Sequence, residues 1–340
     1  MLPNWNQRIV RIKRTKTPHI TLGMLFVFCM LQACGTSGGG SGQSQPAIAP
    51  QTVSAPRTSR VVKISNAYDE KRNWRSVASS SDGSRLVAVV EGGNIYTSTD
   101  AGVTWTPRDA ARVWISVASS ANGDKLVAAE LGGQLYTSSD TGVTWTARDQ
   151  DRNWYAVASS ADGGKLVAAE SGGQIYTSSN AGATWTAHDE NRSWMCVASN
   201  ADGTRLVAAE SAMGQIYTST DSGLTWTPRD SARGWYSVAI SANGEKMVAS
   251  DYTGQVYISS DSGATWSAGF SSNGWVSLAS STDGSTLVAV AEDGAIHTST
   301  DAGISWATNS TTIHWATVAS SADGTRMFAL ATDSKIYTLN

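Results

Sequence analysis

A tryptophan recurs along this 340-residue chain at intervals of 40 residues, with a single interval of 41, at Trp74, Trp114, Trp154, Trp194, Trp235, Trp275 and Trp315. A second series keeps the same period, at Trp105, Trp145, Trp185, Trp226, Trp266 and Trp306. The two series contain 13 of the 14 tryptophans. A fixed period of this length indicates one supersecondary unit that has been copied. Residues 60–340 are therefore expected to fold as an array of seven similar units.

Each unit contains four short stretches typical of β-strands, rich in β-branched and aromatic residues and bounded by Gly, Asp, Asn or Ser. Examples of the four, in their order within a unit, are residues 74–79, 126–129, 175–178 and 225–227. Between the first and second stretch every unit carries Asp-Gly or Asn-Gly, beginning at Asp82, Asn122, Asp162, Asp202, Asn243, Asp283 and Asp323. Such pairs accept a positive φ at both central positions of a turn, which predicts a hairpin. No helical period is present, so the fold class is all-β.

Four antiparallel strands every 40 residues, repeated seven times, are typical of a seven-bladed β-propeller with four-stranded blades. WD40 propellers have a similar repeat length, but their Gly-His and Trp-Asp signatures are missing here. The last unit stops after its third strand, at Thr338. The stretch 61–65, Val-Val-Lys-Ile-Ser, precedes Trp74 by about the spacing of a fourth strand. We expect this N-terminal strand to complete the last blade, which removes two open sheet edges.

The turn between the third and fourth strands has a nearly fixed sequence. It reads STDAGVTW, SSDTGVTW, SSNAGATW, STDSGLTW, SSDSGATW and STDAGISW in the first six units. This sequence resembles the Asp box, or BNR repeat, S-x-D-x-G-x-T-W. The conserved position of the box is held here by Asp100, Asp140, Asn180, Asp221, Asp261 and Asp301.

A structural role is expected for these boxes. The carboxylate should accept hydrogen bonds from backbone N–H groups two residues on, and the glycine should adopt a conformation closed to other residues. The alternative is a calcium site. Each box offers one carboxylate, and Asn180 would keep a hydrogen-bond acceptor but weaken a site for a hard cation. We therefore predict no metal site.

Asp boxes also occur in sialidases, so hydrolysis has to be considered. That resemblance implies a Tyr nucleophile with a Glu partner, an acidic acid/base residue and three arginines that bind a carboxylate. The Arg-Ile-Pro motif of that family is replaced here by Arg60-Val-Val-Lys-Ile. Tyr155 and Tyr236 are the tyrosines that the repeat explains least. Since the only length change among the units is one residue near Met213, no loop insertion marks a catalytic site. We predict that the chain is not an enzyme and needs no cofactor, and a fluorogenic sialoside assay tests this.

One loop position departs from a purely structural repeat. Arginine stands two residues before the blade tryptophan, at Arg72, Arg112, Arg152, Arg192 and Arg233. Acidic residues recur between the second and third strands, at Glu130, Glu170, Glu210 and Asp251, with Glu91 and Glu292 shifted by one position. In a propeller both loop sets emerge on the same face, opposite the Asp boxes. Two interpretations remain open: ion pairs between blades, or a recognition face on which arginines bind carboxylates of a partner.

The chain is also similar to the photosystem II assembly factor type of propeller. That family is seven-bladed, carries a signal and Asp-box-like turns, and gathers arginines on one face. The resemblance implies a non-enzymatic scaffold that holds a membrane-protein precursor. The alternative is a carbohydrate-binding or sialidase-like propeller, so the expected partner is a protein or a glycan. We expect a monomer.

The first 59 residues have a different composition. Five basic residues precede the apolar run of residues 20–31, which is too short to span a bilayer as a helix. The sequence Leu31-Gln32-Ala33-Cys34-Gly35 resembles a bacterial lipobox, in which the cysteine is lipidated. We therefore predict a signal peptide over residues 1–33, and an acylated Cys34 with a flexible Gly/Ser/Pro/Gln-rich linker over residues 34–59. The expected location is the outward side of a bacterial membrane, and Gly35 after the cysteine favours the outer membrane.

Cleavage before Cys34 changes the charge of the chain. It removes five of the 25 basic residues and none of the 28 acidic ones, which takes the net charge from −3 to −8. Nucleic-acid binding needs basic surface and is not expected. Of the three cysteines, Cys29 leaves with the signal and Cys34 is lipidated, so Cys196 has no partner for an internal disulfide.

Overall fold

A computed structural model describes residues 62, 64–68, 72–211, 213–272, 274–311, 313–332 and 335–339. The predicted signal peptide, Cys34 and the linker lie outside these residues. The described residues form 22 β-strands joined by turns, as expected for an all-β chain. Among them there is no helix long and apolar enough to cross a membrane.

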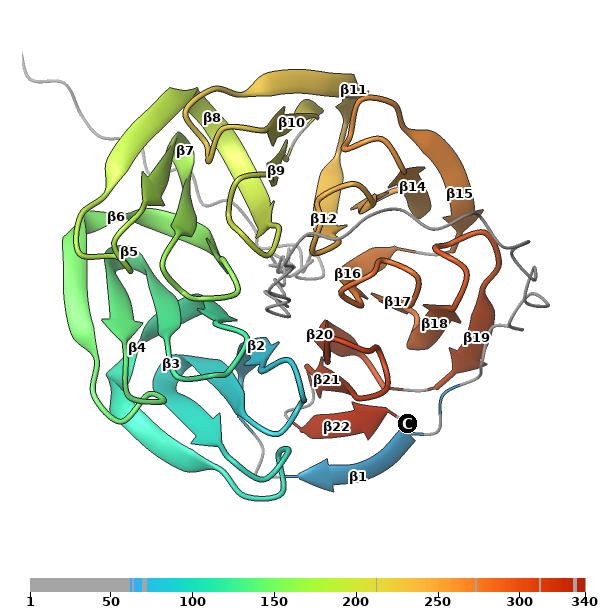
Figure 1. The fold of residues 1–340 in the computed structure, drawn as a ribbon. Helices are drawn as coiled ribbons and strands as arrows, with labels where there is room; N and C mark the ends of the chain where they lie inside the picture. Colours follow the sequence, from blue (N-terminus) through green and yellow to red (C-terminus); the bar gives the residue numbers. More distant parts are fainter. Residues whose placement is uncertain are drawn as a thin grey trace, which may run out of the picture.

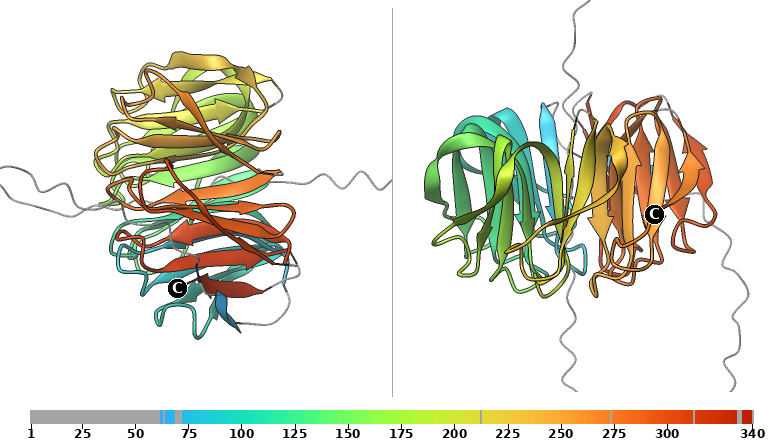
Figure 2. Two further views of the ribbon diagram at one scale, coloured as in Figure 1. Left: turned by 90° about the vertical axis from the view of Figure 1, so that its right-hand side faces the viewer. Right: turned by 90° about the horizontal axis from the view of Figure 1, so that it is seen from above.

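The strands form antiparallel sheets arranged around a central axis (Figure 1). Edge-on views show a thick disc (Figure 2). Two of the four-stranded sheets run outward in chain order. One contains β12 (Trp235–Ile240), β13 (Met247–Asp251), β14 (Gln255–Ser259) and β15 (Ser267–Ser271). The other contains β16 (Trp275–Ser280), β17 (Leu287–Ala291), β18 (Ala295–Ser299) and β19 (Ala307–Ser310).

The third four-stranded sheet joins the two ends of the propeller. Its order is β1-β22-β21-β20, with bounds Ile64–Tyr68, Ile336–Leu339, Met327–Ala331 and Trp315–Ser320. Strand β1 pairs antiparallel with β22, Ile64 opposite Leu339 and Tyr68 opposite Ile336. The expected closing strand is therefore present, but it begins three residues later than the predicted stretch 61–65. Val62 lies just before it, is 5% exposed, and packs in the core with Trp315 and Met327.

The first four units share one ten-stranded sheet instead of forming separate four-stranded sheets. Its strands are β2 (Trp74–Ser79), β3 (Leu86–Ser98), β4 (Thr106–Ser119), β5 (Leu126–Ser138), β6 (Thr146–Ser159), β7 (Leu166–Ser178), β8 (Thr186–Ser199), β9 (Leu206–Glu210), β10 (Gly214–Ser219) and β11 (Thr227–Arg233). Strand β4 pairs with β3 through its first half and with β5 through its second half. Strands β6 and β8 do the same.

A bend inside these long strands lets them pass from the rim of one unit to the centre of the next. Asp109, Asp149 and Asp189 have φ values of 49°, 58° and 63°. Aspartate is one of the few residues that tolerates this left-handed conformation. Between β11 and β12 the strand is interrupted at Gly234, which stands where the earlier units have Val113, Asn153 and Ser193.

Backbone hydrogen bonds connect the inner hairpins of all seven units into a closed ring. The N–H of each residue donates to the carbonyl of the equivalent residue in the next unit, in the order Ser81, Ala121, Ala161, Ala201, Ala242, Thr282, Ala322 and back to Ser81. The seven N···O distances are 2.7–3.0 Å. The described part of the chain is therefore a closed circle and not an open solenoid.

The inner tryptophans form the centre of each unit. Trp74, Trp114, Trp154, Trp194, Trp235, Trp275 and Trp315 are at most 2% exposed. In six units the ring meets a tyrosine edge-on, at 5.0–5.3 Å between centroids. In the sixth unit His297 replaces this tyrosine and lies 4.9 Å from Trp275. Such edge-to-face pairs stabilise a core by about 0.5–1.5 kcal/mol beyond the area they bury.

The inner hairpin turns differ from the prediction. Only the glycine adopts a positive φ, for example Gly83 at 69°, and the preceding Asp or Asn does not. The turn is longer than two residues, because the Ser80 N–H donates to the Arg85 carbonyl and the Gly83 N–H to the Ser80 carbonyl. The Asp82 carboxylate fixes the turn by accepting hydrogen bonds from the Ser80 hydroxyl and the Ser84 N–H.

Candidate functional site

The five arginines singled out by the sequence lie two residues before the buried tryptophans. Arg112, Arg152 and Arg192 lie within β4, β6 and β8, Arg233 ends β11, and Arg72 precedes β2. Glu130, Glu170 and Glu210 lie near the ends of the second strands of their units, opposite the blade tryptophans in the sheet register. We call the five arginines the arginine ring.

Each guanidinium of the central three members lies between two carboxylates and a tyrosine. In the case of Arg152, Nε is 3.2 Å from Asp149 Oδ2, and Nη1 is 3.7 Å from Glu170 Oε2. Its Cζ atom lies 4.5 Å from the centroid of the Tyr176 ring, a cation–π distance. Arg112 and Arg192 repeat this arrangement with Asp109, Glu130 and Tyr136, and with Asp189, Glu210 and Tyr217.

These contacts connect adjacent units. Asp149 lies at the outer strand of one unit, whereas Glu170 and Tyr176 belong to the next. The structure thus brings together the predicted pairs Arg112–Glu130, Arg152–Glu170 and Arg192–Glu210, at 3.8, 3.7 and 3.4 Å. This geometry is that of ion pairing between blades. Because the arginine side chains remain 23–31% exposed, a binding role stays a prediction.

The other members of the two rings are arranged differently. Arg233 pairs with Asp230 at 3.4 Å and lies over Tyr257 at 4.4 Å. Arg72 lies over Tyr96 at 4.4 Å. Glu91 bonds Arg75 and Asn73. Asp251 accepts hydrogen bonds from Thr253 and Tyr257.

Sequence reasoning missed the aspartates Asp109, Asp149, Asp189 and Asp230. They combine the positive φ at the bend with a carboxylate that contacts the arginine three residues later. The signal was present as the repeated pattern D-x-x-R-x-W, which occurs five times, at residues 69–74, 109–114, 149–154, 189–194 and 230–235. The pattern recurs with the same spacing as the blade tryptophans, because each copy ends on one of them.

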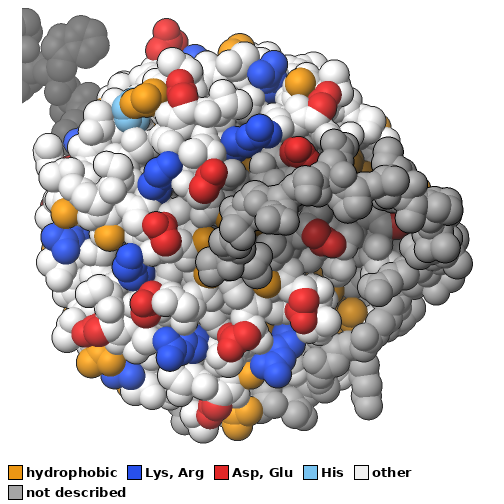
Figure 3. Space-filling model, viewed as in Figure 1, with side chains coloured by type: hydrophobic (Ala, Val, Ile, Leu, Met, Phe, Trp, Pro, Cys, Tyr) orange, Lys and Arg blue, Asp and Glu red, His pale blue; other side chains and the backbone are white. Residues whose placement is uncertain are grey.

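The electrostatics of this cluster favour the ionised arginine. Burial alone would lower the pKa of Arg192, but Tyr217, Asp189 and Glu210 raise it above its ordinary value. Burial, followed by the Glu210 charge, raises the pKa of Tyr217. On the face of the disc shown in Figure 3, basic and acidic side chains alternate around the axis, and neither sign forms a continuous patch among the described residues.

The predicted Asp-box residues lie in the turns before the outer strands, at the other end of the sheets from the arginine ring. Asp140 accepts hydrogen bonds from the Ser138 hydroxyl, the Thr144 N–H and the Thr144 hydroxyl, at 2.7, 2.9 and 2.6 Å. The backbone donor is therefore four residues after the aspartate and not two as expected, because residues 141–143 form the turn between Asp140 and Thr144. Gly142 has a φ of 80° as predicted, and its carbonyl accepts the Trp145 indole N–H at 3.0 Å.

The backbone N–H four residues on is accepted in the same way in the other five boxes, by Asp100, Asn180, Asp221, Asp261 and Asp301. The tryptophan indole N–H also bonds the glycine carbonyl in four of these five, whereas the indole N–H of Trp185 in the third box has no hydrogen-bond partner among the described residues. Asn180 keeps the acceptor role, since its Oδ1 accepts the Thr184 N–H at 2.9 Å and its Nδ2 donates to the Thr184 hydroxyl. The outer strands begin after the tryptophan, for example β11 at Thr227, and not at 225 as predicted. No cluster of three or more His, Cys, Asp or Glu suited to a metal occurs within the described ranges.

Tyr155 and Tyr236 each follow a blade tryptophan on an inner strand. Burial raises the pKa of Tyr155 to about 12. Burial, together with the neighbouring Tyr155 and Glu292, also raises the pKa of Tyr236. Burial thus disfavours the ionised phenolate at both positions.

Comparison with known proteins finds a likeness only among solved structures. The structure entitled "YCF48 bound to D1 peptide" superposes with a TM-score of 0.66 at 16% identity, covering 83% of this chain and 98% of that one. YCF48 from Cyanidioschyzon merolae gives the same TM-score and identity, with 83% and 99% covered. No protein-family model and no curated protein matches the sequence. At this identity the likeness shows a shared propeller fold.

Proposed function

We propose that this chain is a non-catalytic, membrane-anchored propeller that binds a segment of a protein partner, in the manner of photosystem II assembly factors. The observation that carries the proposal is the likeness in fold over nearly the whole of the structure of YCF48 bound to D1 peptide. We further propose that the seven units are seven blades. The closed ring of seven backbone hydrogen bonds supports this count.

The arginine ring is the proposed docking surface. The Nε atoms of Arg112 and Arg152 face Asp109 and Asp149 of one unit, and their Nη1 atoms face Glu130 and Glu170 of the next unit. A guanidinium has five N–H donors, so Nη2 of each, which forms no ion pair with another described residue, can donate to a carboxylate of the partner. Since Asp109, Glu130, Asp149 and Glu170 already hold the two arginines in place, little side-chain entropy is lost on binding.

The chemistry of the described residues supports binding rather than catalysis. Tyr155 and Tyr236, the candidate nucleophiles that the sialidase resemblance suggests, have raised pKa values. The aspartates of the Asp boxes use their carboxylate oxygens to fix turns. A protein-binding propeller needs neither an activated nucleophile nor a metal.

The membrane anchor is the second part of the proposal and rests on the lipobox-like sequence around Cys34. An acylated cysteine followed by a linker of about 25 residues would hold the disc near a bacterial membrane surface, in the periplasm or on the cell surface. Substitution of Cys34→Ser is expected to release the protein from the membrane fraction into the soluble fraction.

Crosslinking and pull-down from native membranes test the docking surface. We expect the double variant Arg112→Gln and Arg152→Gln to capture at least tenfold less of the partner than the unaltered protein. The matched control is Arg108→Gln with Arg148→Gln. These arginines lie in the same two strands, but each donates to a threonine of its own unit, away from the arginine ring.

Glutamine is used because a carboxylate beside Asp109 and Glu130 would disturb the fold by repulsion. Thermal melts of both double variants check that folding is retained. If the first pair captures the partner as well as the control pair, the arginine ring is not the docking surface. If no partner is crosslinked to the unaltered protein, the proposed protein-binding function fails as a whole.

A further inference from the structure

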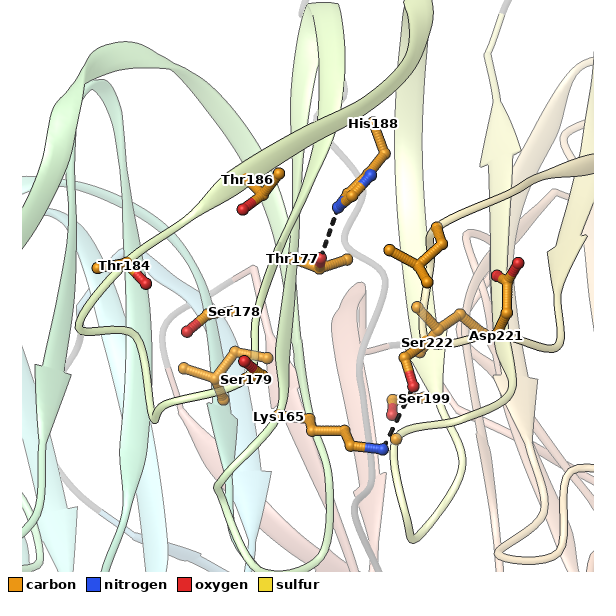
Figure 4. Close-up of a pocket in the computed structure, with 14 residues that line it drawn as sticks. Lys165, Thr177, Ser178, Ser179, Thr184, Thr186, His188, Ser199, Asp221 and Ser222 are labelled. Atoms are coloured by element: carbon orange, nitrogen blue, oxygen red, sulfur yellow. Dashed lines mark hydrogen bonds between the residues drawn. The ribbon is translucent and has the colours of Figure 1, made fainter.

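A cavity of about 350 Å³ opens between the third and fourth units, at the Asp-box end of the sheets. Hydroxyl groups from both units line it, together with Lys165, His188 and Asp221 (Figure 4). Leu166, Leu206 and Leu224 supply its apolar wall. Its volume falls within the range of small-molecule sites. It is separated from the arginine ring by the length of the strands, because β7 carries Glu170 near one end of the sheet and Ser178 at the other.

The repeat shows why this cleft is open. The equivalent outer-strand position holds Arg108, Arg148 and Arg229 in the first, second and fourth units, and each Nε donates to a threonine at 2.9–3.0 Å. In the third unit that position is His188. The matching clefts beside the first and second units measure about 10 and 160 Å³.

Loss of the long arginine side chain also uncovers the threonine beneath it. Thr97, Thr137 and Thr218 are 2–6% exposed, whereas Thr177 is only partly buried. The His188 imidazole reaches Thr177, with 2.8 Å between Nε2 and Oγ1 (Figure 4). The exchange of arginine for histidine thus leaves space beside a threonine that the arginine covers in the first, second and fourth units. The fifth unit also has no arginine here, because Gly269 holds the position, and its cleft of about 210 Å³ is lined mainly by apolar side chains such as Met247, Ile258 and Ile304.

Polar groups of both kinds surround the space. The side chains of Ser179, Thr184 and Thr186 are exposed. Lys165 Nζ donates to the Ser222 hydroxyl at 3.2 Å, whereas Lys125 and Lys246 donate to backbone carbonyls of the next hairpin. Burial lowers the pKa of His188, which favours the neutral imidazole. The charges left are the Lys165 ammonium and the Asp221 carboxylate, which balance each other.

We propose that this cavity binds one monosaccharide unit, an uncharged ring that carries several hydroxyl groups. Such a ligand can donate to and accept from the serine and threonine hydroxyls that line the walls. An anion such as phosphate would be attracted by the Lys165 ammonium group but repelled by the Asp221 carboxylate, because both line the same cavity. The site is independent of the proposed docking of a protein on the arginine ring.

Saturation-transfer NMR with methyl glycosides of glucose, galactose, mannose and N-acetylglucosamine tests the site, with inorganic phosphate as the competing arm. We expect at least one glycoside to bind, with a dissociation constant on the order of 1 mM or tighter. The variant His188→Arg should weaken this binding at least tenfold, because it rebuilds the arginine–threonine contact of the neighbouring units and fills the cavity. We expect the variant to fold, because the first, second and fourth units already have arginine at this position.

Two further variants make the outcome decisive. Thr177→Val keeps the volume and removes the hydroxyl, so it should also weaken binding. Arg148→Lys in the adjacent unit should leave binding unchanged. The proposal is overturned if no glycoside binds, if phosphate binds better than every glycoside, or if His188→Arg binds as well as the unaltered protein. Capture of a protein partner should be the same with His188→Arg, which separates this proposal from the previous one.

Discussion

At the scale of single residues, small hydroxyl side chains connect neighbouring inner strands. The Ser76 and Ser116 hydroxyls accept the N–H groups of Val117 and Val157, at 3.1 and 3.2 Å. Ser237 and Ser277 do the same for Leu278 and Val318. All four serines are at most 1% exposed. Since a buried N–H without an acceptor is costly, these serines help to fix how closely adjacent units approach.

We predict that Ser116→Ala destabilises the fold by about 1–2 kcal/mol, because the buried Val157 N–H loses its acceptor. Thermal melting should show a lower Tm. The third unit supplies the reciprocal change, since Ala156 stands at the equivalent position before Val197. Ala156→Ser should raise the Tm or leave it unaltered. A Tm of Ser116→Ala equal to that of the unaltered protein would show that these bonds contribute nothing to stability.

At the scale of elements, the Asp-box turn shows how one side chain defines a loop. Its carboxylate accepts two bonds from the same residue four positions on, and the residue before the glycine joins the glycine in the left-handed region, as with Thr141 at 61° and Gly142 at 80°. The tryptophan N–H then bonds the glycine carbonyl. The apolar residue after the glycine takes part only through its backbone, since the Ile304 N–H donates to the Asp301 carbonyl while its side chain leaves the residue 86% exposed.

The pH dependence of this turn is open to measurement with Asp261→Asn, which copies the natural Asn180. Hydrogen bonds from Thr265 lower the pKa of Asp261 to about 2. A carboxyl group with a lowered folded-state pKa stabilises the fold above the unfolded-state value near 4, and this stabilisation is lost as the pH falls through about 2. The variant should therefore have a lower Tm at pH 6, by no more than about 2 °C because the group is exposed.

Between pH 4 and pH 2 the Tm difference between the variant and the unaltered protein should shrink toward zero, since asparagine does not titrate. Asn180→Asp should give the opposite sign at pH 6. A Tm difference that is the same at both pH values would contradict a role for the ionised carboxylate in the turn.

The elements also show what the sequence could predict and where it stopped. The strands, their antiparallel order and the closing strand could be predicted from the period of 40 residues, because the same strand and turn signals occur in every copy of the unit. The merging of four units into one ten-stranded sheet did not follow. Asp230 has the same left-handed backbone as Asp109, but the strand after it is interrupted at Gly234, whereas the strands of the earlier units continue through Val113, Asn153 and Ser193. The contact of Arg112 with Tyr136 was missed because the tyrosine belongs to the next unit and is far away in the sequence. The contact with Asp109, only three residues before Arg112, was missed although the D-x-x-R-x-W pattern indicates it. The cavity at His188 is visible only when side-chain volumes are compared between units.

At the scale of the whole molecule, two independent sets of contacts close the circle. One is the ring of backbone hydrogen bonds between inner hairpins, which ends with the Ala322 N–H on the Ser81 carbonyl at 2.8 Å. The other is at the rim, where β1 pairs with β22 and the Asn309 side chain donates to the Val62 carbonyl at 2.8 Å. Both join residues far apart in the sequence: Ser81 and Ala322 of the inner ring are about 240 positions apart, and the paired residues of the rim about 270. A propeller closed in this way leaves only short, protected sheet edges.

The last prediction concerns removal of the contacts at the rim, where β1 pairs with β22. A chain that begins at residue 69 lacks Val62 and all of β1, so β22 becomes an open edge and the core around Trp315 loses a buried valine. We expect a lower Tm, because ladder hydrogen bonds and apolar burial are lost together. We also expect concentration-dependent association through the new edge. The matched control begins at residue 60 and keeps both, so its melt should equal that of the unaltered protein. If the two shortened chains melt at the same temperature, closure depends on the inner ring alone and β1 is dispensable.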